Sequence, residues 1–162
     1  MEYRIRENEW GIVVDALVAE LARLSGGQAA RPWNGRAALV LLSGDLGAGK
    51  TTFVQNLART LGVTETLQSP TFVIQKNYSL TLGERVGVRA LLPTSYSLLT
   101  HIDAYRLNEL RELTVLGFEH YLADPQNLIL LEWPEQVPGI AEHPHISIRI
   151  EHDRDARKVT IS

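Results

Sequence analysis

The sequence predicts an α/β fold, a three-layer sandwich in which helices cover both faces of a mixed, partly parallel central sheet. Strand-like and helix-like segments alternate through the first part of the chain, whereas strand-like segments gather toward its end. In addition, an apolar run at 38–43 passes through a glycine-rich turn directly into an amphipathic helical segment. A chain of 162 residues has the usual length of one domain, so we expect a single domain over residues 1–162.

The composition is that of a globular protein of ordinary charge. The chain contains no cysteine, which excludes disulfides, thiolate zinc sites and a cysteine nucleophile. Its net charge of −3 does not favour autonomous binding of RNA or DNA, because domains that hold nucleic acid on their own are usually basic. The first residues, MEYRIRENEW, lack the apolar core of a signal peptide, and no apolar run approaches the length of a membrane span. We therefore expect a cytoplasmic protein with no membrane contact.

The first predicted helix runs from a cap at Asn8 to about Leu24. Apolar side chains recur at helical spacing on one face of this segment, at Val13, Leu17, Leu21 and Leu24. A packing helix is its expected role. A loop rich in glycine, proline and small residues follows it.

The most informative stretch is 39–52, LVLLSGDLGAGKTT. It satisfies the phosphate-loop pattern of glycine, any four residues, glycine, lysine, and serine or threonine, at Gly44, Gly49, Lys50 and Thr51. Glycine allows a tight turn with positive φ and leaves no Cβ in the way of a phosphate, so the backbone N–H groups form a nest of donors. The lysine can reach the outer phosphates, and the threonine hydroxyl is suited to bind magnesium.

The predicted fold is therefore that of a P-loop NTPase, with a nucleoside triphosphate at the start of the helix that follows the turn. This helix, at 52–61, has its apolar positions at Phe53, Val54, Leu57, Ala58 and Leu61. The residues of the turn and helix start that we expect to bind the nucleotide are Asp45, Leu46, Gly47, Ala48, Gly49, Lys50, Thr51 and Thr52.

The rest of the chain contains further strand and helix patterns. Strands are predicted at 73–78, 97–102, 127–131, 146–151 and 158–162, a charged turn at 153–157, and short helices at 108–113 and 117–122. Asn108 is the expected cap of the first short helix. Residues 79–96 form either a hairpin extension or a mobile excursion. Ser69 and Thr71 belong either to a simple turn around a proline or to a switch-like segment that senses the nucleotide.

Two acidic residues stand at the ends of predicted strands. Asp103 follows the segment YSLLTHI, and Glu132 follows NLILL. A phosphate loop requires an acidic group for its magnesium site and another polar group to position water, and neighbouring strand ends supply such groups in open α/β sheets. Spacing alone does not assign the two roles, and either acid could be a solvated strand end. We interpret His101 as structural, whereas Trp133 is compatible both with core packing and with the rim of a nucleotide site.

Four motifs taken together resemble one protein family. They are GDLGAGKTTF at 44–53, SPTF at 69–72, HIDAYRL at 101–107 and LEWPE at 131–135. In this order they are similar to the TsaE (YjeE) family of small bacterial ATPases, which are needed for the threonylcarbamoyl modification of the adenosine beside the tRNA anticodon. The resemblance implies a single-domain ATPase that uses ATP and Mg²⁺.

The resemblance also implies roles for individual residues. Lys50 would bind the phosphates and, with Asp103, act in hydrolysis. Thr51 and Glu132 would hold magnesium. Trp133 matches a tryptophan beside the nucleotide site in the family.

The resemblance further implies partners and leaves two segments open. Family members work with the TsaB and TsaD proteins and do not themselves transfer the threonylcarbamoyl group, so tRNA is reached only indirectly through the complex. Arg157 matches a basic turn near the nucleotide. The chain departs from the family at Glu9-Trp10-Gly11, where the first helix of the family often begins with a threonine near the base, and residues 79–96 look longer than in many relatives. Trp10 and Arg157 are therefore the candidates for contacts near the base.

Other functions share the phosphate loop. A small-molecule or nucleotide kinase would need an acceptor pocket and an arginine-bearing lid, for which Arg106 and Arg111 are available, on a short helix among leucines. A GTPase switch would need the guanine-reading motif Asn-Lys-x-Asp, and the segment QKNY at 75–78 lacks the aspartate. A binding module without hydrolysis also stays open, because the sequence does not distinguish it from a slow ATPase.

Overall fold

The computed structural model describes most of the chain, namely residues 1–25, 33, 35–65, 67, 70, 73–80 and 96–162. Of the SPTF segment only Pro70 is among them, and of 79–96 only the two ends are. The interpretations of Ser69, Thr71 and the 79–96 excursion therefore lie outside the described residues.

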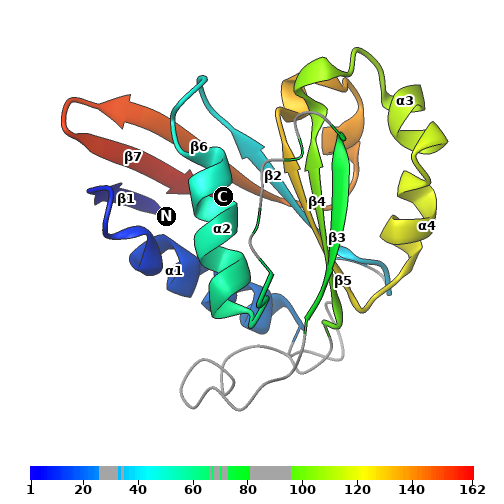
Figure 1. Ribbon diagram of the computed structural model, residues 1–162, viewed down its shortest axis with the longest axis horizontal. Helices are drawn as coiled ribbons and strands as arrows, with labels where there is room; N and C mark the ends of the chain where they lie inside the picture. Colours follow the sequence, from blue (N-terminus) through cyan, green and yellow to red (C-terminus); the bar gives the residue numbers. More distant parts are fainter. Residues whose placement is uncertain (26–32, 34, 66, 68–69, 71–72, 81–95) are drawn as a thin grey trace.

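Among the described residues, seven strands form one mixed sheet in the order β1-β7-β6-β2-β5-β4-β3 (Figure 1). The pairs β6–β2, β2–β5 and β5–β4 are parallel, and the other three pairs are antiparallel. This arrangement confirms the predicted mixed, partly parallel sheet. The bounds are β1 (Glu2–Ile5), β2 (Ala38–Ser43), β3 (Gln75–Ser79), β4 (Leu98–Asp103), β5 (Asn127–Glu132), β6 (Ile146–Asp153) and β7 (Ala156–Ile161).

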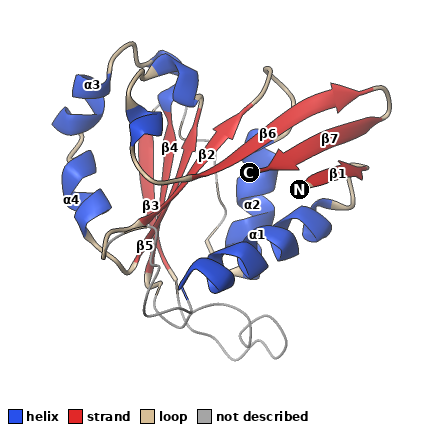
Figure 2. Ribbon diagram, turned by 180° about the vertical axis from the view of Figure 1, so that it is seen from behind, coloured by secondary structure: helices blue, strands red, loops and turns tan. Residues whose placement is uncertain are grey.

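Helices cover both faces of the sheet, as Figures 1 and 2 show from opposite sides. The helices α1 (Trp10–Ser25) and α2 (Lys50–Thr60) lie on one face, and α3 (Leu110–Val115) and α4 (Phe118–Ala123) lie on the other. Short 3-10 helices lie at Ala104–Arg106, Pro134–Gln136 and Ile140–Glu142. The three-layer prediction is thus confirmed. In the described part of the chain, no helix is both long enough and apolar enough to cross a membrane.

The central strand β2 contributes to two separate cores, because successive side chains of a strand point to opposite faces. Ala38, Val40 and Leu42 pack in the core that contains α1 and α2. Leu39 and Leu41 pack in the core that contains α3 and α4. Burial on both faces explains why this strand is a continuous apolar run rather than an alternating one.

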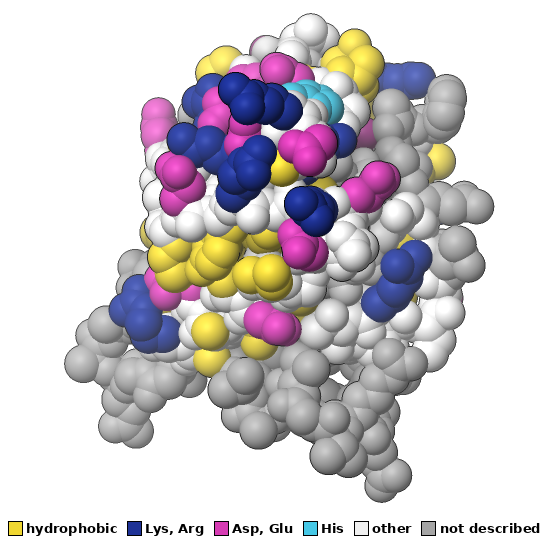
Figure 3. Space-filling model, turned by 90° about the vertical axis from the view of Figure 1, so that its left-hand side faces the viewer, with side chains coloured by type: hydrophobic (Ala, Val, Ile, Leu, Met, Phe, Trp, Pro, Cys, Tyr) yellow, Lys and Arg dark blue, Asp and Glu magenta, His cyan; other side chains and the backbone are white. Residues whose placement is uncertain are grey.

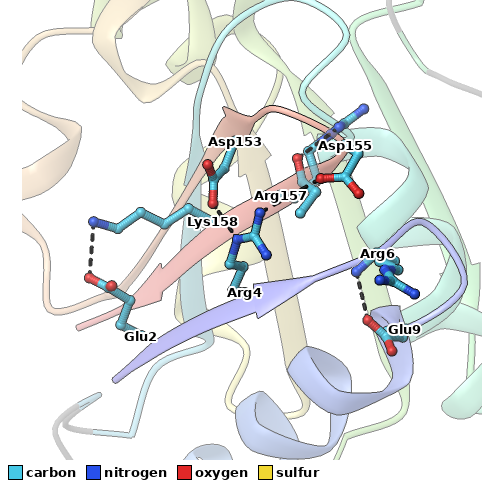
Figure 4. A network of polar contacts seen from close by, with 9 residues as sticks. Glu2, Arg4, Arg6, Glu9, Asp153, Asp155, Arg157 and Lys158 are labelled. Carbon is cyan, nitrogen blue, oxygen red and sulfur yellow. Dashed lines mark hydrogen bonds and ion pairs between the residues drawn. The ribbon is translucent and has the colours of Figure 1, made fainter.

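The strand β1 has no counterpart among the predicted elements. Only its last residue, Ile5, is buried, so the segment lacks the apolar alternation that predicts a strand. It forms because it pairs with β7, and ion pairs join it to β7 and to the end of β6 (Figure 4). Arg4 Nε lies 2.5 Å from Asp153 Oδ2. Glu2 Oε2 lies 3.1 Å from Lys158 Nζ.

Some element ends differ from the predicted ones because backbone hydrogen bonds, rather than the apolar pattern, set them. The helix α3 begins at Leu110 instead of directly after Asn108. The Glu112 carboxylate accepts the N–H groups of Asn108 and Glu109 at 2.6 and 3.1 Å, so these residues stay outside the helix. The strand β7 begins at Ala156, which reduces the predicted charged turn to two residues, 154–155.

Candidate functional site

The glycine-rich loop joins the end of β2 to the start of α2. Three of its glycines have positive φ angles, 139° at Gly44, 78° at Gly47 and 109° at Gly49. A Cβ on Gly44 would lie 2.1 Å from the Ile150 carbonyl oxygen, and one on Gly49 would lie 2.6 Å from the Trp10 ring. A Cβ on Gly47 would meet no atom of the described residues within 4 Å. The first and last glycines therefore permit close packing within the protein, whereas at Gly47 the positive φ, and no neighbouring atom of the described residues, favours glycine.

The start of α2 offers hydrogen-bond donors at this loop. The first-turn N–H groups of a helix have no helical partner, and the N-cap Gly49 has no side chain that could accept from them. Together with the positive end of the helix dipole, these donors form a place that binds anions such as phosphate. The other predicted contact residues differ in exposure: Ala48 is buried, Thr52 is half-buried, and Asp45, Leu46 and Gly47 are exposed.

The Lys50 side chain is buried beside the loop, with 5% of its surface exposed. Its Nζ donates to the carbonyl oxygens of Gly44 and Asp45 at 2.5 and 3.0 Å. It also lies 3.6 Å from the centroid of the Trp133 ring, within the range of a cation–π contact. Burial lowers the pKa of Lys50, and nearby carboxylates, led by Glu132, oppose that shift. Carbonyl dipoles and a ring face therefore hold the ammonium group at the loop.

Asp103 and Glu132 lie side by side at the carboxyl ends of β4 and β5. They are paired in the register of these parallel strands, and both are buried. Asp103 Oδ1 accepts the N–H of Tyr105 at 3.0 Å and so caps the short helix after β4. The Thr51 hydroxyl donates to the Glu132 carboxylate, with distances of 3.1 and 3.2 Å to its two oxygens. The fold thus brings Glu132 into contact with the loop threonine and places Asp103 beside Glu132 on the neighbouring strand.

His101 belongs to this cluster, although the sequence interpretation treated it as structural. Its Nε2 lies 2.7 Å from Glu132 Oε1, and the two side chains are 0% and 2% exposed. His101 and Asp103 are two residues apart on β4, so both side chains project from the same face of the sheet. This period-two spacing is the signal that could have found it, because a residue two positions before a strand-end acid shares the face of that acid.

The side chain of Trp133 lies against Lys50, at the end of the phosphate loop. Its backbone has a φ of 61°, which is rare for a bulky residue, and its N–H donates to the Leu42 carbonyl at 3.1 Å. The indole packs against the Tyr105 ring, with the ring centroids 5.1 Å apart, while its face meets Lys50. Trp133 therefore lies next to the phosphate loop rather than in the centre of a core.

Trp10 occupies a different place from the one expected. It is 3% exposed, packs against Phe53 with the ring centroids 6.2 Å apart, and lies under the backbone of Gly49. The expectation that Trp10 is available to a nucleotide base is therefore wrong. It starts α1 and supports the loop from the core side, because its apolar ring is better buried than exposed.

Arg157 reaches the loop from the start of β7; Figure 4 shows its surroundings. Its Nε donates to the Ala48 carbonyl and its Nη1 to the Ala156 carbonyl, each at 3.0 Å. The predicted basic turn thus lies beside the loop. The guanidinium therefore fixes the loop carbonyl of Ala48 by a hydrogen bond.

The side-chain oxygen atoms of Thr51 and Glu132 are suitable ligands for magnesium. Mg²⁺ prefers hard oxygen ligands and is usually bound by one or two carboxylates together with the phosphates of a substrate. Here a hydroxyl and a buried carboxylate already lie in contact at the start of a helix that can bind phosphate. The loop and these two residues therefore have the chemistry for a nucleotide with magnesium.

Comparisons with known proteins agree with this description. The family model for "Threonylcarbamoyl adenosine biosynthesis protein TsaE" matches residues 14–159. The tRNA threonylcarbamoyladenosine biosynthesis protein TsaE of Bacillus subtilis is 37% identical over 128 residues, which cover 76% of this chain and 68% of that protein. The same-named protein of Synechocystis sp. is 41% identical over 105 residues, covering 63% of this chain and 57% of that protein. The crystal structure of YdiB from Bacillus subtilis has a TM-score of 0.55 and 25% identity, and the match covers 99% of this chain and 83% of that one.

The parallel strands, the glycine-rich loop and the helix that follows it define a protein with the P-loop NTPase fold. Because the family model matches nearly the whole chain, the protein belongs to the TsaE family. Relatives in this family are named for the biosynthesis of threonylcarbamoyladenosine in tRNA. The resemblance in four motifs is thus confirmed at the level of the family, and the chain spans little more than half of the Synechocystis relative.

Proposed function

We propose that this protein binds ATP with Mg²⁺ and hydrolyses the ATP. The contact between Thr51 and Glu132 carries the proposal. It joins the start of α2, where phosphates would bind, to a buried acid that lies beside Asp103. An anion site, metal ligands and a second acid are the groups that phosphoryl transfer to water requires.

Each of these side chains has a role that its position supports. Lys50 binds the outer phosphates from its place at the loop. Thr51 and Glu132 would hold Mg²⁺, which neutralises charge on the phosphates when it is bound. Asp103 orients the attacking water and takes its proton. Trp133, whose ring lies against Lys50, and Arg157, which donates to the loop carbonyl of Ala48, contribute to the binding of the nucleotide.

We further propose that this activity serves the threonylcarbamoyl modification of the adenosine beside the tRNA anticodon, in the cytoplasm and together with TsaB and TsaD. The names of the relatives support the pathway. The net charge of −3 supports an indirect role toward tRNA, and on the face that Figure 3 shows, basic and acidic side chains are interspersed. Proteins that bind a phosphate backbone directly present an excess of lysine and arginine. Partner proteins, rather than this chain, would then contact the tRNA and transfer the group.

ATP turnover, measured as release of phosphate in the presence of Mg²⁺, tests the activity. Lys50→Ala is expected to abolish turnover, because it removes the cation at the phosphates. Glu132→Ala is expected to lower magnesium-dependent turnover by more than the roughly 10–100-fold that loss of a residue outside the ligand set typically costs, because it removes a ligand itself. Arg149→Ala, an exposed position on β6, is the control and should retain wild-type turnover.

The outcomes separate the competing functions. Unchanged turnover in both the Lys50 and the Glu132 variants would refute the ATPase assignment. Phosphate transferred to an added small molecule, instead of released, would indicate a kinase. Stronger competition by GTP than by ATP would indicate a GTPase.

Co-purification with TsaB and TsaD, with and without ATP, tests the place in the pathway. We expect a complex whose yield depends on the nucleotide. Absence of a complex under every nucleotide condition would contradict the proposed partnership while leaving the ATPase activity to be judged by the turnover assay.

A further inference from the structure

The contact between His101 and Glu132 lies deeper in the molecule than the other contacts of the site. His101 is on β4, in register between Lys76 of β3 and Leu130 of β5, and its side chain has no exposed surface. Its Nε2 lies 2.7 Å from Glu132 Oε1, closer than the Thr51 hydroxyl at 3.1 Å. The carboxylate is therefore held between a strand side chain and the start of α2.

The surroundings of the two ring nitrogens of His101 indicate which of them donates a hydrogen bond. Among the described residues, Nδ1 is buried and has no hydrogen-bond partner. A proton on Nδ1 would be a buried, unsatisfied donor, which is costly, whereas a bare Nδ1 is only an unused acceptor. Nε2 therefore carries a proton, which it donates to the Glu132 carboxylate.

We propose that His101 is a positioning residue for the magnesium site: its Nε2–H orients the Glu132 carboxylate toward Thr51 and so sets the affinity for the divalent cation. This inference rests on the proposed binding of ATP with Mg²⁺. The physical reason is that a glutamate side chain has three rotatable bonds, and a hydrogen bond to one oxygen fixes the direction of the carboxylate. Hydrogen bonds from outside the ligand set commonly change metal affinity by about 10–100-fold.

The chain allows a test with closely matched variants. In His101→Gln, the amide nitrogen can take the place of Nε2 and donate to Glu132. In His101→Leu, a side chain of similar size has no donor. In His101→Asn, the amide is polar but too short to reach the carboxylate, so this variant replaces the leucine variant if the latter does not fold.

The readout is the binding of a fluorescent ATP analogue during a titration with Mg²⁺, together with binding in EDTA and the melting temperature. For half of the Mg²⁺-dependent increase in binding of the analogue, we expect the leucine and asparagine variants to require a Mg²⁺ concentration roughly 10–100-fold higher than the wild type does. The glutamine variant should stay within about threefold, since it keeps the donor. Binding in EDTA should be the same in all variants, because Lys50 and the loop N–H groups are unchanged.

The possible failures are distinct. A magnesium requirement that is unchanged in the leucine and asparagine variants, or equally raised in the glutamine variant, overturns the positioning role. A loss of binding in EDTA equal to the loss in Mg²⁺ also overturns it, because it shows a general structural effect. Wild-type protein that binds no nucleotide under any condition overturns the proposed function itself, and this inference with it.

Discussion

Lys50 shows how a single residue can be placed for a ligand instead of for stability. Its ammonium group is removed from water, yet its partners within the described residues are two carbonyl oxygens and a tryptophan ring. Burial is the largest cause of its lowered pKa, which means that the fold disfavours the charged form relative to water. Carboxylates lie near this cation, but among the described residues none forms an ion pair with it, and a bound phosphate would supply one.

We therefore predict that Lys50→Met does not lower the free energy of unfolding at neutral pH when nucleotide is absent, although it removes nucleotide binding. Below the lowered pKa, the lysine is charged in both states and the folded wild type bears the full cost of burial. As the pH rises from the lowered pKa toward the ordinary value of 10.5, the unfolded chain keeps a proton that the folded protein has released, so wild-type stability increases. The free energy of unfolding of the wild type should therefore increase at alkaline pH relative to that of the Lys50→Met variant.

Denaturant unfolding at several pH values measures this effect. Lys158→Met is the matched control, because Lys158 lies partly exposed on β7 and its side chain pairs with Glu2. A Lys50 variant that is clearly less stable than the wild type at pH 7 would show that the lysine stabilises the fold after all.

At the scale of the elements, the site depends on how closely three segments approach one another: the strand β2, the phosphate loop, and the hairpin formed by β6 and β7. The strand β2 is parallel to β6, and the last pair in their register is Ser43 with Arg149. The next residues, Gly44 and Ile150, lie so close that a Cβ on Gly44 would clash with the Ile150 backbone. The start of β7 adds the hydrogen bond from Arg157 to Ala48. The phosphate loop is therefore supported by a hairpin from the other end of the chain.

We predict that Gly44→Ala lowers the free energy of unfolding by about 2–5 kcal/mol, since it combines a strained backbone with a clash against backbone atoms. Gly47→Ala is the control, because its positive φ is strained but its Cβ meets no described atom. It should cost only about 1–2 kcal/mol. Urea unfolding midpoints at constant slope measure both values. Equal losses in the two variants would argue against the close approach of the loop to β6.

At the scale of the whole molecule, the site lies at the edge of the sheet where the parallel strands end. The strands β2, β5 and β4 end there, and residues from α2, β4, β5 and β7 meet around one loop. A ligand bound at this point would contact segments that are distant in the sequence. Since such contacts exist only in the folded state, ligand binding should stabilise the molecule as a whole.

We predict that a non-hydrolysable ATP analogue with Mg²⁺, at about 100 times its dissociation constant, raises the melting temperature by roughly 5–10 °C. The reason is that this excess stabilises the folded state by about 2.7 kcal/mol. Chelation of Mg²⁺ should reduce the increase, because the Thr51 and Glu132 oxygens then lack their cation. Thermal unfolding with and without EDTA tests this, and an increase that is identical in EDTA would argue against a magnesium site.

Much of the fold could be predicted because its elements have strong local patterns. The strand β2 was predicted with the observed bounds, and α2 within two residues of them. The strand β1 was missed, because its three charged or half-exposed residues are ordered by the ladder with β7 and not by their own pattern. Trp10 was misplaced for a related reason, since the sequence does not show whether an aromatic ring at a helix start packs inward or outward.

The sequence by itself determined the phosphate loop, because its glycines, Lys50 and Thr51 act through the backbone of one short segment. Only the tertiary structure decided which distant side chains join it. The pairing of β4 with β5 places Asp103 beside Glu132, and the two-residue spacing on β4 adds His101. Strand order depends on pairing between segments far apart in the chain, where any compatible backbones can form a ladder, so local patterns predict the strands but not their neighbours.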